Sequence, residues 1–247
     1  MERWKYFDIT HRDHMLCNPL DLTKLDELIG LLGLPADARV LDMATGKAEL
    51  LVRLAERTRV RGVGVDLSPY CIRDARTKAS RRGVEASLAF VLADGATFDP
   101  GPDPFDLTLC IGASWVFGGH RGTLAALRDR TRAGGQVLVG EPYWRADPPK
   151  EYLAAMQLAP GAFLTHAGNV AAGEDVGLVP LYTLVSSPND WDRYEGLQWR
   201  AAERYAVDHP DDPDVPELLK RTRRSRDAYL RDGRDVLGWA LYLFRRA

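Results

Sequence analysis

Cysteines are few in this sequence, and they show no spacing that would pair them or bind a metal ion. Cys17, Cys71 and Cys110 are odd in number and form no C-x-x-C motif, so neither a disulfide framework nor a zinc site is predicted. No cluster of histidine, cysteine and aspartate has metal-ligand spacing, and we expect no metal requirement. Reduced thiols are typical of the cytoplasm, where we expect the protein to act.

Long apolar runs and an excess of positive charge are also missing. No window reaches the ~20 apolar residues of a membrane span, and the charged start MERWKYFDITHRDHMLCNPL lacks an apolar run of signal-peptide length. We therefore expect neither membrane insertion nor secretion. The 33 basic and 35 acidic residues give a net charge of −2. This charge disfavours a nucleic-acid partner, because a surface that binds nucleic acid must neutralise many phosphates.

The 247 residues suffice for one sizeable α/β domain, either a monomer or a homodimer. Short apolar runs alternate with helix-patterned stretches, which is typical of βαβ units that feed a parallel sheet. Strands are predicted at 39–43, 62–67, 88–94, 105–112, 135–141, 177–187 and 235–247. Helices are predicted at 48–57, 71–83 and 122–135, with a short one at 151–156 and a longer one that begins near Asn189 or Asp190.

The stretch VLDMATGKAEL, residues 40–50, looks like a nucleotide-binding loop that has lost two glycines. Asp42 closes a strand, Gly46 provides a tight turn, and a helix begins directly afterwards. Ala44 and Ala48 stand where the pattern has glycine. Because alanine adds one methyl group, we expect it to be tolerated where φ is negative and the ligand does not contact that carbon.

Acidic residues end the next two strands. Asp66 lies about 20 residues after Gly46, the usual distance of a ribose-binding acid, and its paired oxygens suit a vicinal diol. We expect this carboxylate to have no partner without ligand. Asp66 alone does not separate NAD from other adenosine ligands, but Asp94, at the end of the third strand, could bind an adenine amino group.

The order of these motifs resembles class I S-adenosylmethionine-dependent methyltransferases. An acid after each of the first three strands, the fourth strand FDLTLCIG and the turn and strand RAGGQVLVGE follow the family order, with Ala133 where proline is commoner. The phrases NPL, GASWVFGG and GEPYW resemble a little-characterised bacterial subgroup. The resemblance implies a Rossmann-like doubly wound α/β sheet of about seven strands, mostly parallel with an antiparallel last strand, in the order 3-2-1-4-5-7-6 with helices on both faces.

The resemblance further implies S-adenosylmethionine as the cofactor and S-adenosylhomocysteine as its product. Asp42 and the loop after it would hold the methionine end, Asp66 the ribose, and Asp94 the adenine amino group. Two residues would flank the adenine ring and one would lie beneath the sulfonium. The complete set of implied cofactor-binding residues is Asp42, Ala44, Thr45, Gly46, Asp66, Leu67, Ala93, Asp94, Gly95 and Ile111.

We interpret residues 1–247 as one methyltransferase domain. Within it, we expect residues 1–36 to form an N-terminal helical lid, 38–141 the cofactor-binding half, and 142–247 the substrate-side and C-terminal half. Trp115, Tyr143 and Trp144 follow the fourth and fifth strands, at the edge where open sheets bind ligands. They are predicted to wall a pocket for a small methyl acceptor, with ordinary packing as the alternative.

A general base is needed only if the acceptor carries a proton, because methyl transfer from a sulfonium depends chiefly on positioning. His14 in the N-terminal segment and Glu141 at the end of the fifth strand are the candidates, and a structural role is the alternative for each. His11, His120 and Cys17 lie in the same regions of the sequence.

The favoured function is methylation of a small molecule. The basic stretch 220–234 leaves an RNA- or protein-directed methyltransferase open, although its interleaved acids favour a solvated helix face. IGAS stands where enzymes that methylate base amino groups carry N/D-P-P-Y. An NAD-type oxidoreductase is disfavoured because a Tyr-x-x-x-Lys pair is missing, and a non-catalytic binding module is disfavoured by the three intact aspartates.

Overall fold

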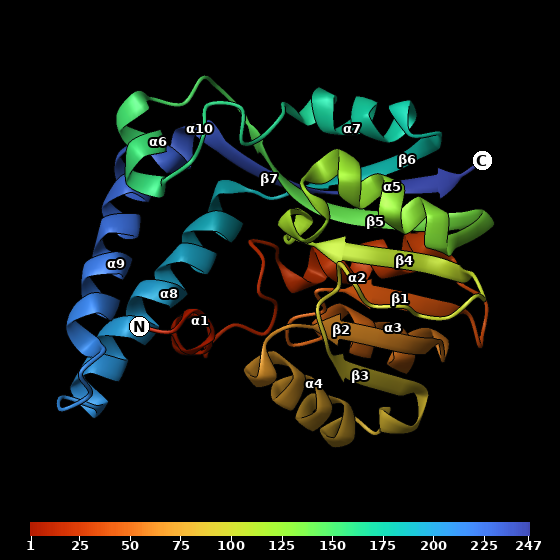
Figure 1. Ribbon diagram of the computed structural model, residues 1–247, viewed down its shortest axis with the longest axis horizontal. Coiled ribbons are helices and arrows are strands. Elements are labelled where there is room, and N and C mark those ends of the chain that lie inside the picture. The colour runs from red at the N-terminus through yellow and green to blue at the C-terminus, as the bar shows by residue number, and fades with distance from the viewer.

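Seven strands form one sheet in the computed structural model, which describes residues 1–247 (Figure 1). Their order, β3-β2-β1-β4-β5-β7-β6, confirms the predicted order. Neighbours among β1 to β5 are parallel, and β7 runs antiparallel to both β5 and β6, as expected. The strands are β1 (Arg39–Met43), β2 (Arg61–Asp66), β3 (Leu88–Leu92), β4 (Phe105–Ile111), β5 (Thr131–Trp144), β6 (Leu178–Val185) and β7 (Leu237–Arg246).

Helices cover both faces of the sheet. Alternating strand side chains divide the core into two layers: one packs against α2, α3 and α4, and the other packs against α5 and α7. The helices are α1 (Arg3–Thr10), α2 (Leu22–Leu32), α3 (Glu49–Thr58), α4 (Pro69–Arg81), α5 (His120–Arg130), α6 (Lys150–Met156), α7 (His166–Asp175), α8 (Pro188–Asp208), α9 (Val215–Ala228) and α10 (Arg234–Val236), with short turns η1 (Glu85–Ser87), η2 (Ser114–Phe117) and η3 (Tyr229–Gly233).

A separate group of helices lies beyond the carboxyl ends of the parallel strands. Helices α1, α6, α8 and α9 stand together to the left of the sheet in Figure 1. Small apolar clusters join them: Ile9, Ala202 and Leu218 link α1, α8 and α9, while Tyr152 and Ala228 link α6 to α9. This arrangement places α1 and α8 opposite the edge of the sheet that binds ligands in open α/β folds.

Several element boundaries differ from the sequence predictions. Strand β5 extends to Trp144 because it pairs with β7 along its whole second half. Strand β3 ends at Leu92, before Asp94. Helix α8 begins after Ser187, whose side chain forms a capping box with Asp190, so neither Asn189 nor Asp190 is the N-cap. Helix α7 was not predicted. None of the helices is both long and apolar enough to cross a membrane.

Candidate functional site

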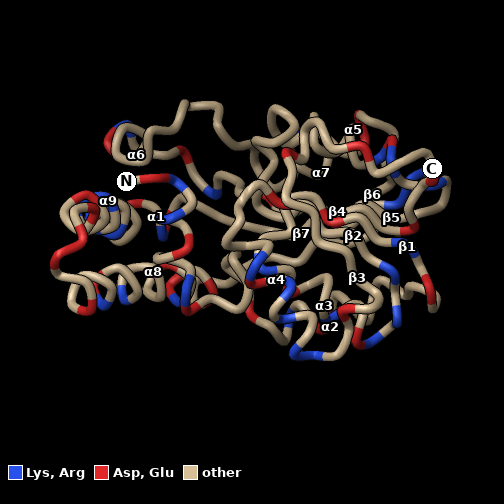
Figure 2. Tube along the Cα trace, turned by 60° about the horizontal axis from the view of Figure 1, so that its bottom comes forward, with Lys and Arg blue, Asp and Glu red and all other residues tan.

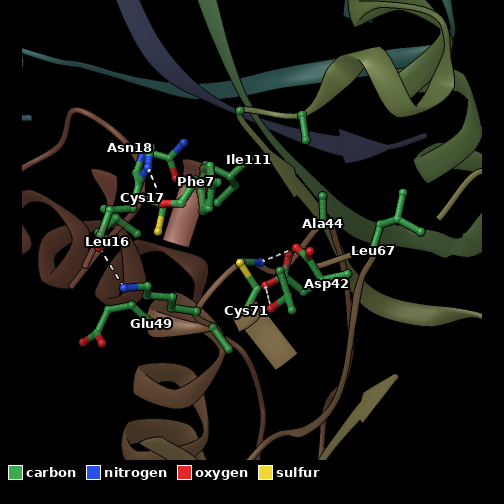
Figure 3. Close-up of a pocket in the computed structure, with 18 of the residues that line it drawn as sticks. Phe7, Leu16, Cys17, Asn18, Asp42, Ala44, Glu49, Leu67, Cys71 and Ile111 are labelled. Atoms are coloured by element: carbon green, nitrogen blue, oxygen red, sulfur yellow. Dashed lines mark hydrogen bonds between the residues drawn. The ribbon is translucent and has the colours of Figure 1, made fainter. Parts of the chain in front are cut away.

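A cavity of about 450 Å3 lies between the carboxyl ends of the strands and the helices beyond them. Loops after β1, β2, β3 and β4 form one wall, and α1, residues 15–19 and α8 form the other. Figure 3 shows Asp42, Ala44 and Leu67 on the sheet side, with Cys17 and Asn18 of the N-terminal segment across from them. Helix α2, which belongs to the same predicted lid, instead packs in the core beneath the sheet.

The loop after β1 adopts left-handed backbone at three positions. The φ angles are 58° at Ala44, 57° at Gly46 and 55° at Ala48. Neither alanine therefore meets the condition of negative φ under which alanine replaces glycine without strain. The loop keeps the conformation that glycine normally provides, because the chain must turn from β1 into α3 within a few residues, at a cost of roughly 1–2 kcal/mol per alanine.

Asp66 is held in place by the backbone before any ligand binds. Its Oδ2 accepts a hydrogen bond from the Gly46 N–H at 2.8 Å, and its Oδ1 accepts one from the Ser68 N–H at 2.8 Å. The expectation that this carboxylate has no partner is wrong, since the left-handed turn aims Gly46 at it. Burial raises the pKa of Asp66 despite these bonds. Because each carboxylate oxygen can accept a second hydrogen bond and Asp66 lines the cavity, it can also accept from a diol.

The other two predicted acids differ in environment. Asp42 is 4% exposed and accepts a hydrogen bond from Thr45 Oγ1 at 2.7 Å. Burial raises the pKa of Asp42 to about 7, an effect that the Thr45 hydroxyl partly opposes. Asp94 is exposed and accepts from the Ala96 N–H at 2.9 Å. Nine of the ten implied cofactor-binding residues line the cavity; Ala93 does not, and packs with the core layer of α5 and α7.

The three predicted pocket aromatics separate. Trp115 lines the cavity and is 52% exposed, with the Arg3 guanidinium 4.5 Å from its ring centre. Tyr143 and Trp144 lie outside the cavity lining. Because β5 is longer than predicted, Tyr143 pairs with Gly238 within the sheet and Trp144 packs 5.1 Å from the Phe163 ring. The structure therefore brings only one of the three to the cavity.

Both candidate bases also lie outside the cavity lining. The His14 Nε2 donates to the backbone oxygen of Tyr194 at 2.9 Å, since a carbonyl can only accept, and its Nδ1 is buried without a partner. Burial lowers the pKa of His14. Glu141 is 4% exposed and accepts from Ser114 Oγ at 2.9 Å. His120 donates to the Asn169 oxygen, so it too makes a structural contact.

His11 and Tyr194 are the residues that the sequence did not point to as a pair. Both line the cavity, and the His11 Nε2 lies 3.0 Å from the Tyr194 hydroxyl. The His11 Nδ1 faces the Phe7 carbonyl at 3.2 Å and so carries the proton, which leaves Nε2 to accept from Tyr194. Burial lowers the pKa of His11 to about 3. The two residues are 183 positions apart, too far for any local sequence pattern to join them.

Comparisons with known proteins agree with this geometry. A methyltransferase domain model matches residues 40–135. The uncharacterized protein YjhP of Escherichia coli (strain K12) is 29% identical over 96% of both chains. A SAM-dependent methyltransferase from Geobacter sulfurreducens, solved with S-adenosyl-L-homocysteine, is 29% identical over 98% of both chains with a TM-score of 0.92.

A SAM-dependent methyltransferase from Thiobacillus denitrificans, also solved with S-adenosyl-L-homocysteine, is 30% identical. The match covers 100% of this chain and 99% of that one, with a TM-score of 0.92. These two methyltransferases resemble this chain along nearly its whole length. The similarity agrees with its strand order, its left-handed loop after β1 and the acid held by backbone after β2. The chain belongs to the class I S-adenosylmethionine-dependent methyltransferases.

Proposed function

We propose that this methyltransferase methylates a small molecule that binds beside the cofactor in the 450 Å3 cavity. The observation that carries the proposal is the covering of the cavity by α1, residues 15–19 and α8. Of its 34 lining residues, 19 are hydrophobic, which suits a partly apolar molecule and suits a polyanionic strand poorly. The proposal includes a reducing cytoplasmic location, which the three free cysteines support.

The cavity wall fits S-adenosylmethionine, which supplies an electrophilic methyl group when bound. Asp66 would accept from the ribose hydroxyls, because both of its oxygens are already oriented by backbone N–H groups. Asp94 would bind the adenine amino group, with Leu67 beside the ring. The loop after β1 would hold the methionine end near Asp42. The positive charge of bound S-adenosylmethionine would favour the ionised form of Asp42, whose pKa of about 7 otherwise leaves it partly protonated.

The geometry supports catalysis by positioning rather than by a general base. His14 and Glu141 do not reach the cavity. His11 does, but a pKa of about 3 makes its imidazole a weak proton acceptor. We therefore assign His11 a positioning role: it orients the Tyr194 hydroxyl and ties the N-terminal segment to α8. Holding the acceptor in line and excluding water are then the main contributions of the protein.

The basic stretch 220–234 gives little support to an RNA-directed enzyme. Arg223 pairs with Glu203, Arg226 with Asp227, and Arg234 with Asp192. These neighbouring acids neutralise much of the charge that phosphates would need. The alternatives of an RNA or a protein acceptor are therefore outcomes of the test below.

Calorimetry followed by methyl-transfer assays tests the proposal. S-adenosylmethionine and S-adenosylhomocysteine are expected to bind, and NAD is not. Labelled S-adenosylmethionine should then methylate a member of a panel of phenols, amines, thiols and carboxylates. Efficient labelling of bulk RNA or protein, with none in the small-molecule panel, would contradict the proposed acceptor class.

A further inference from the structure

The cavity is lined by four carboxylates and by Arg3, Lys47 and Arg221, of which Lys47 follows Gly46 in the loop after β1 and donates to the His11 carbonyl oxygen at 2.7 Å. Its carboxylates belong to the cofactor wall and are already engaged: Asp42 by Thr45, Asp66 by two backbone N–H groups, and Asp94 by the Ala96 N–H. Glu49 is engaged by arginine and lysine side chains. The acids that line the cavity thus have partners at the cofactor wall.

Two arginines line the cavity from the helices that cover it. Arg3 comes from α1 and Arg221 from α9. Figure 2 shows these helices side by side near the N-terminus, and the Tyr6 hydroxyl lies 3.3 Å from Thr222 Oγ1 between them. Arg3 and Tyr6 are three residues apart on α1 and so share one helix face, which places both guanidinium groups on that face of α1.

Aromatic rings hold both guanidinium groups by their faces. The Arg221 carbon Cζ lies 3.8 Å from the centre of the Tyr6 ring. The Arg3 Cζ lies 4.5 Å from the Trp115 ring and 4.8 Å from the Trp4 ring. Stacking of this kind occupies the flat face of a guanidinium and leaves the N–H groups at its edge available to planar anions.

Neither guanidinium has an anionic partner within the protein. Arg3 and Arg221 make no hydrogen bond and lie within 4.0 Å of no carboxylate. Lys5 on α1 pairs with Asp212 and Asp214, and Arg223 on α9 pairs with Glu203. Lys220 and Arg224 of α9 lie outside the cavity lining, so Arg221 is the basic residue of that helix that reaches it. Because the chain as a whole carries a net charge of −2, this unpaired positive charge is a local feature of the cavity.

We propose that Arg3 and Arg221 form an anion subsite, so that the methyl acceptor carries a carboxylate or phosphate group on an apolar body. This inference deepens the proposed function and rests on it. The aromatic residues Trp4, Tyr6 and Trp115 contact the apolar body, and the guanidinium edges bind the anion at the cavity mouth. The wall that carries Asp42, Asp66 and Asp94, by contrast, receives the cofactor. The cofactor and the methyl acceptor therefore bind beside groups of opposite charge.

Probe titrations test the subsite without knowledge of the acceptor. Benzoate and phenyl phosphate are titrated against the S-adenosylhomocysteine-saturated protein, with benzamide and benzyl alcohol as neutral counterparts. We expect at least one anion to bind about tenfold more tightly than its neutral counterpart, since charge-assisted bonds to arginine are stronger than neutral ones. Tighter benzoate binding indicates a carboxylic acid acceptor, and tighter phenyl phosphate binding indicates a phosphate ester.

The double variant R3Q/R221Q should lose this preference. The matched control R223Q/R231Q also removes two positive charges, but from outside the cavity lining, and should keep the anion preference. Equal binding of anionic and neutral probes to the unaltered protein, or an unchanged preference in R3Q/R221Q, would overturn the subsite. A parallel loss of S-adenosylhomocysteine affinity in R3Q/R221Q would also overturn it, because the arginines would then bind the carboxylate of the cofactor.

Repeating the titrations without S-adenosylhomocysteine separates the two proposals. Failure of the unaltered protein to bind S-adenosylhomocysteine tells against the proposed function, while the anion preference is still measured directly. Normal cofactor binding without an anion preference tells against the subsite alone.

Discussion

Two alanines in the loop after β1, Ala44 and Ala48, have left-handed backbone, which is unusual for a residue with a side chain. Both alanines line the cavity, but Ala44 is only partly buried, whereas Ala48 is 1% exposed and packs in the core. Glycine would relieve the backbone strain at either position. The methyl group that each alanine contributes differs in value, because only the one on Ala48 is buried in the core.

The variants Ala44→Gly and Ala48→Gly should therefore differ in stability. We expect Ala44→Gly to raise the free energy of unfolding by about 0.5–1 kcal/mol, after allowance for the greater freedom of glycine in the unfolded chain. Ala48→Gly should be close to neutral, since it also loses a buried methyl group worth about 0.8 kcal/mol. Urea denaturation measures both, and equal gains would contradict the strain argument.

We expect Asp66 to have two roles, binding the ribose and accepting hydrogen bonds from two backbone N–H groups, of which Asp94 shares the second only in part. Asp66→Ala should cost about 2–4 kcal/mol of S-adenosylhomocysteine binding through the loss of charge-assisted hydrogen bonds. It should also lower the free energy of unfolding, because the Gly46 and Ser68 N–H groups lose their acceptor. Asp94→Ala should weaken binding with a smaller loss of stability, since Asp94 is exposed. Calorimetry and denaturation on both variants check this, and unchanged affinity in Asp66→Ala would disprove the ribose assignment.

Strand β5 carries a buried acid, Glu141, near its carboxyl end. Glu141 lies within the strand, with one oxygen bonded to Ser114 and the other without a partner. Burial raises the pKa of Glu141 from 4.5 to about 7, an effect that the Ser114 hydrogen bond partly opposes. A raised pKa means that the folded protein holds a proton that the unfolded chain releases, so this group loses stabilising effect as pH rises from about 4.5 to about 7.

Glu141→Gln should remove this contribution. The stability of the variant relative to the unaltered protein is expected to rise with pH between about 4.5 and 7, by up to about 1.4 kcal/mol per pH unit. Asp42, whose pKa is also raised to about 7, adds a dependence of the same sign in both proteins and cancels in the difference. Denaturation curves across this range measure it, and a flat difference would show that folding does not raise the pKa of Glu141.

The cavity is formed by elements from both ends and the middle of the chain. Its walls come from α1 and residues 15–19, from four strand ends, and from α8 and α9. Trp115 follows β4 and lines the cavity beside Arg3, whereas Asp42, Asp66 and Asp94 line it from the ends of β1, β2 and β3.

Trp115→Ala should therefore affect the acceptor and spare the cofactor. With an acceptor found in the panel, we expect the KM to rise or the turnover to fall, while S-adenosylhomocysteine affinity changes little. Trp144→Phe, outside the cavity, is the control and should leave the acceptor KM unchanged. An equal effect of Trp115→Ala on both ligands would place this side chain at the cofactor instead.

Strand periodicity predicted the strands, and the family resemblance implied their order and the ten cofactor-binding residues, nine of which line the cavity. Asp42, Asp66 and Asp94 are local signals, because each directly follows or ends an apolar run. Tyr143 and Trp144 were misplaced since the end of β5 depends on its pairing with β7, almost a hundred residues later. The two candidate bases lie outside the cavity lining for a similar reason: burial of His14 and Glu141 depends on packing partners from distant elements.

The sequence by itself determined the strand order, through its βαβ pattern and family motifs, and the acids of the cofactor wall, because these depend on residues close together in the chain. Only the tertiary structure decided which histidine reaches the cavity, which of the three predicted aromatic residues lines it, and that Arg3 and Arg221 line the same cavity. Those choices depend on the docking of α1 against α8 and α9, a contact between the two ends of the chain that no local pattern encodes.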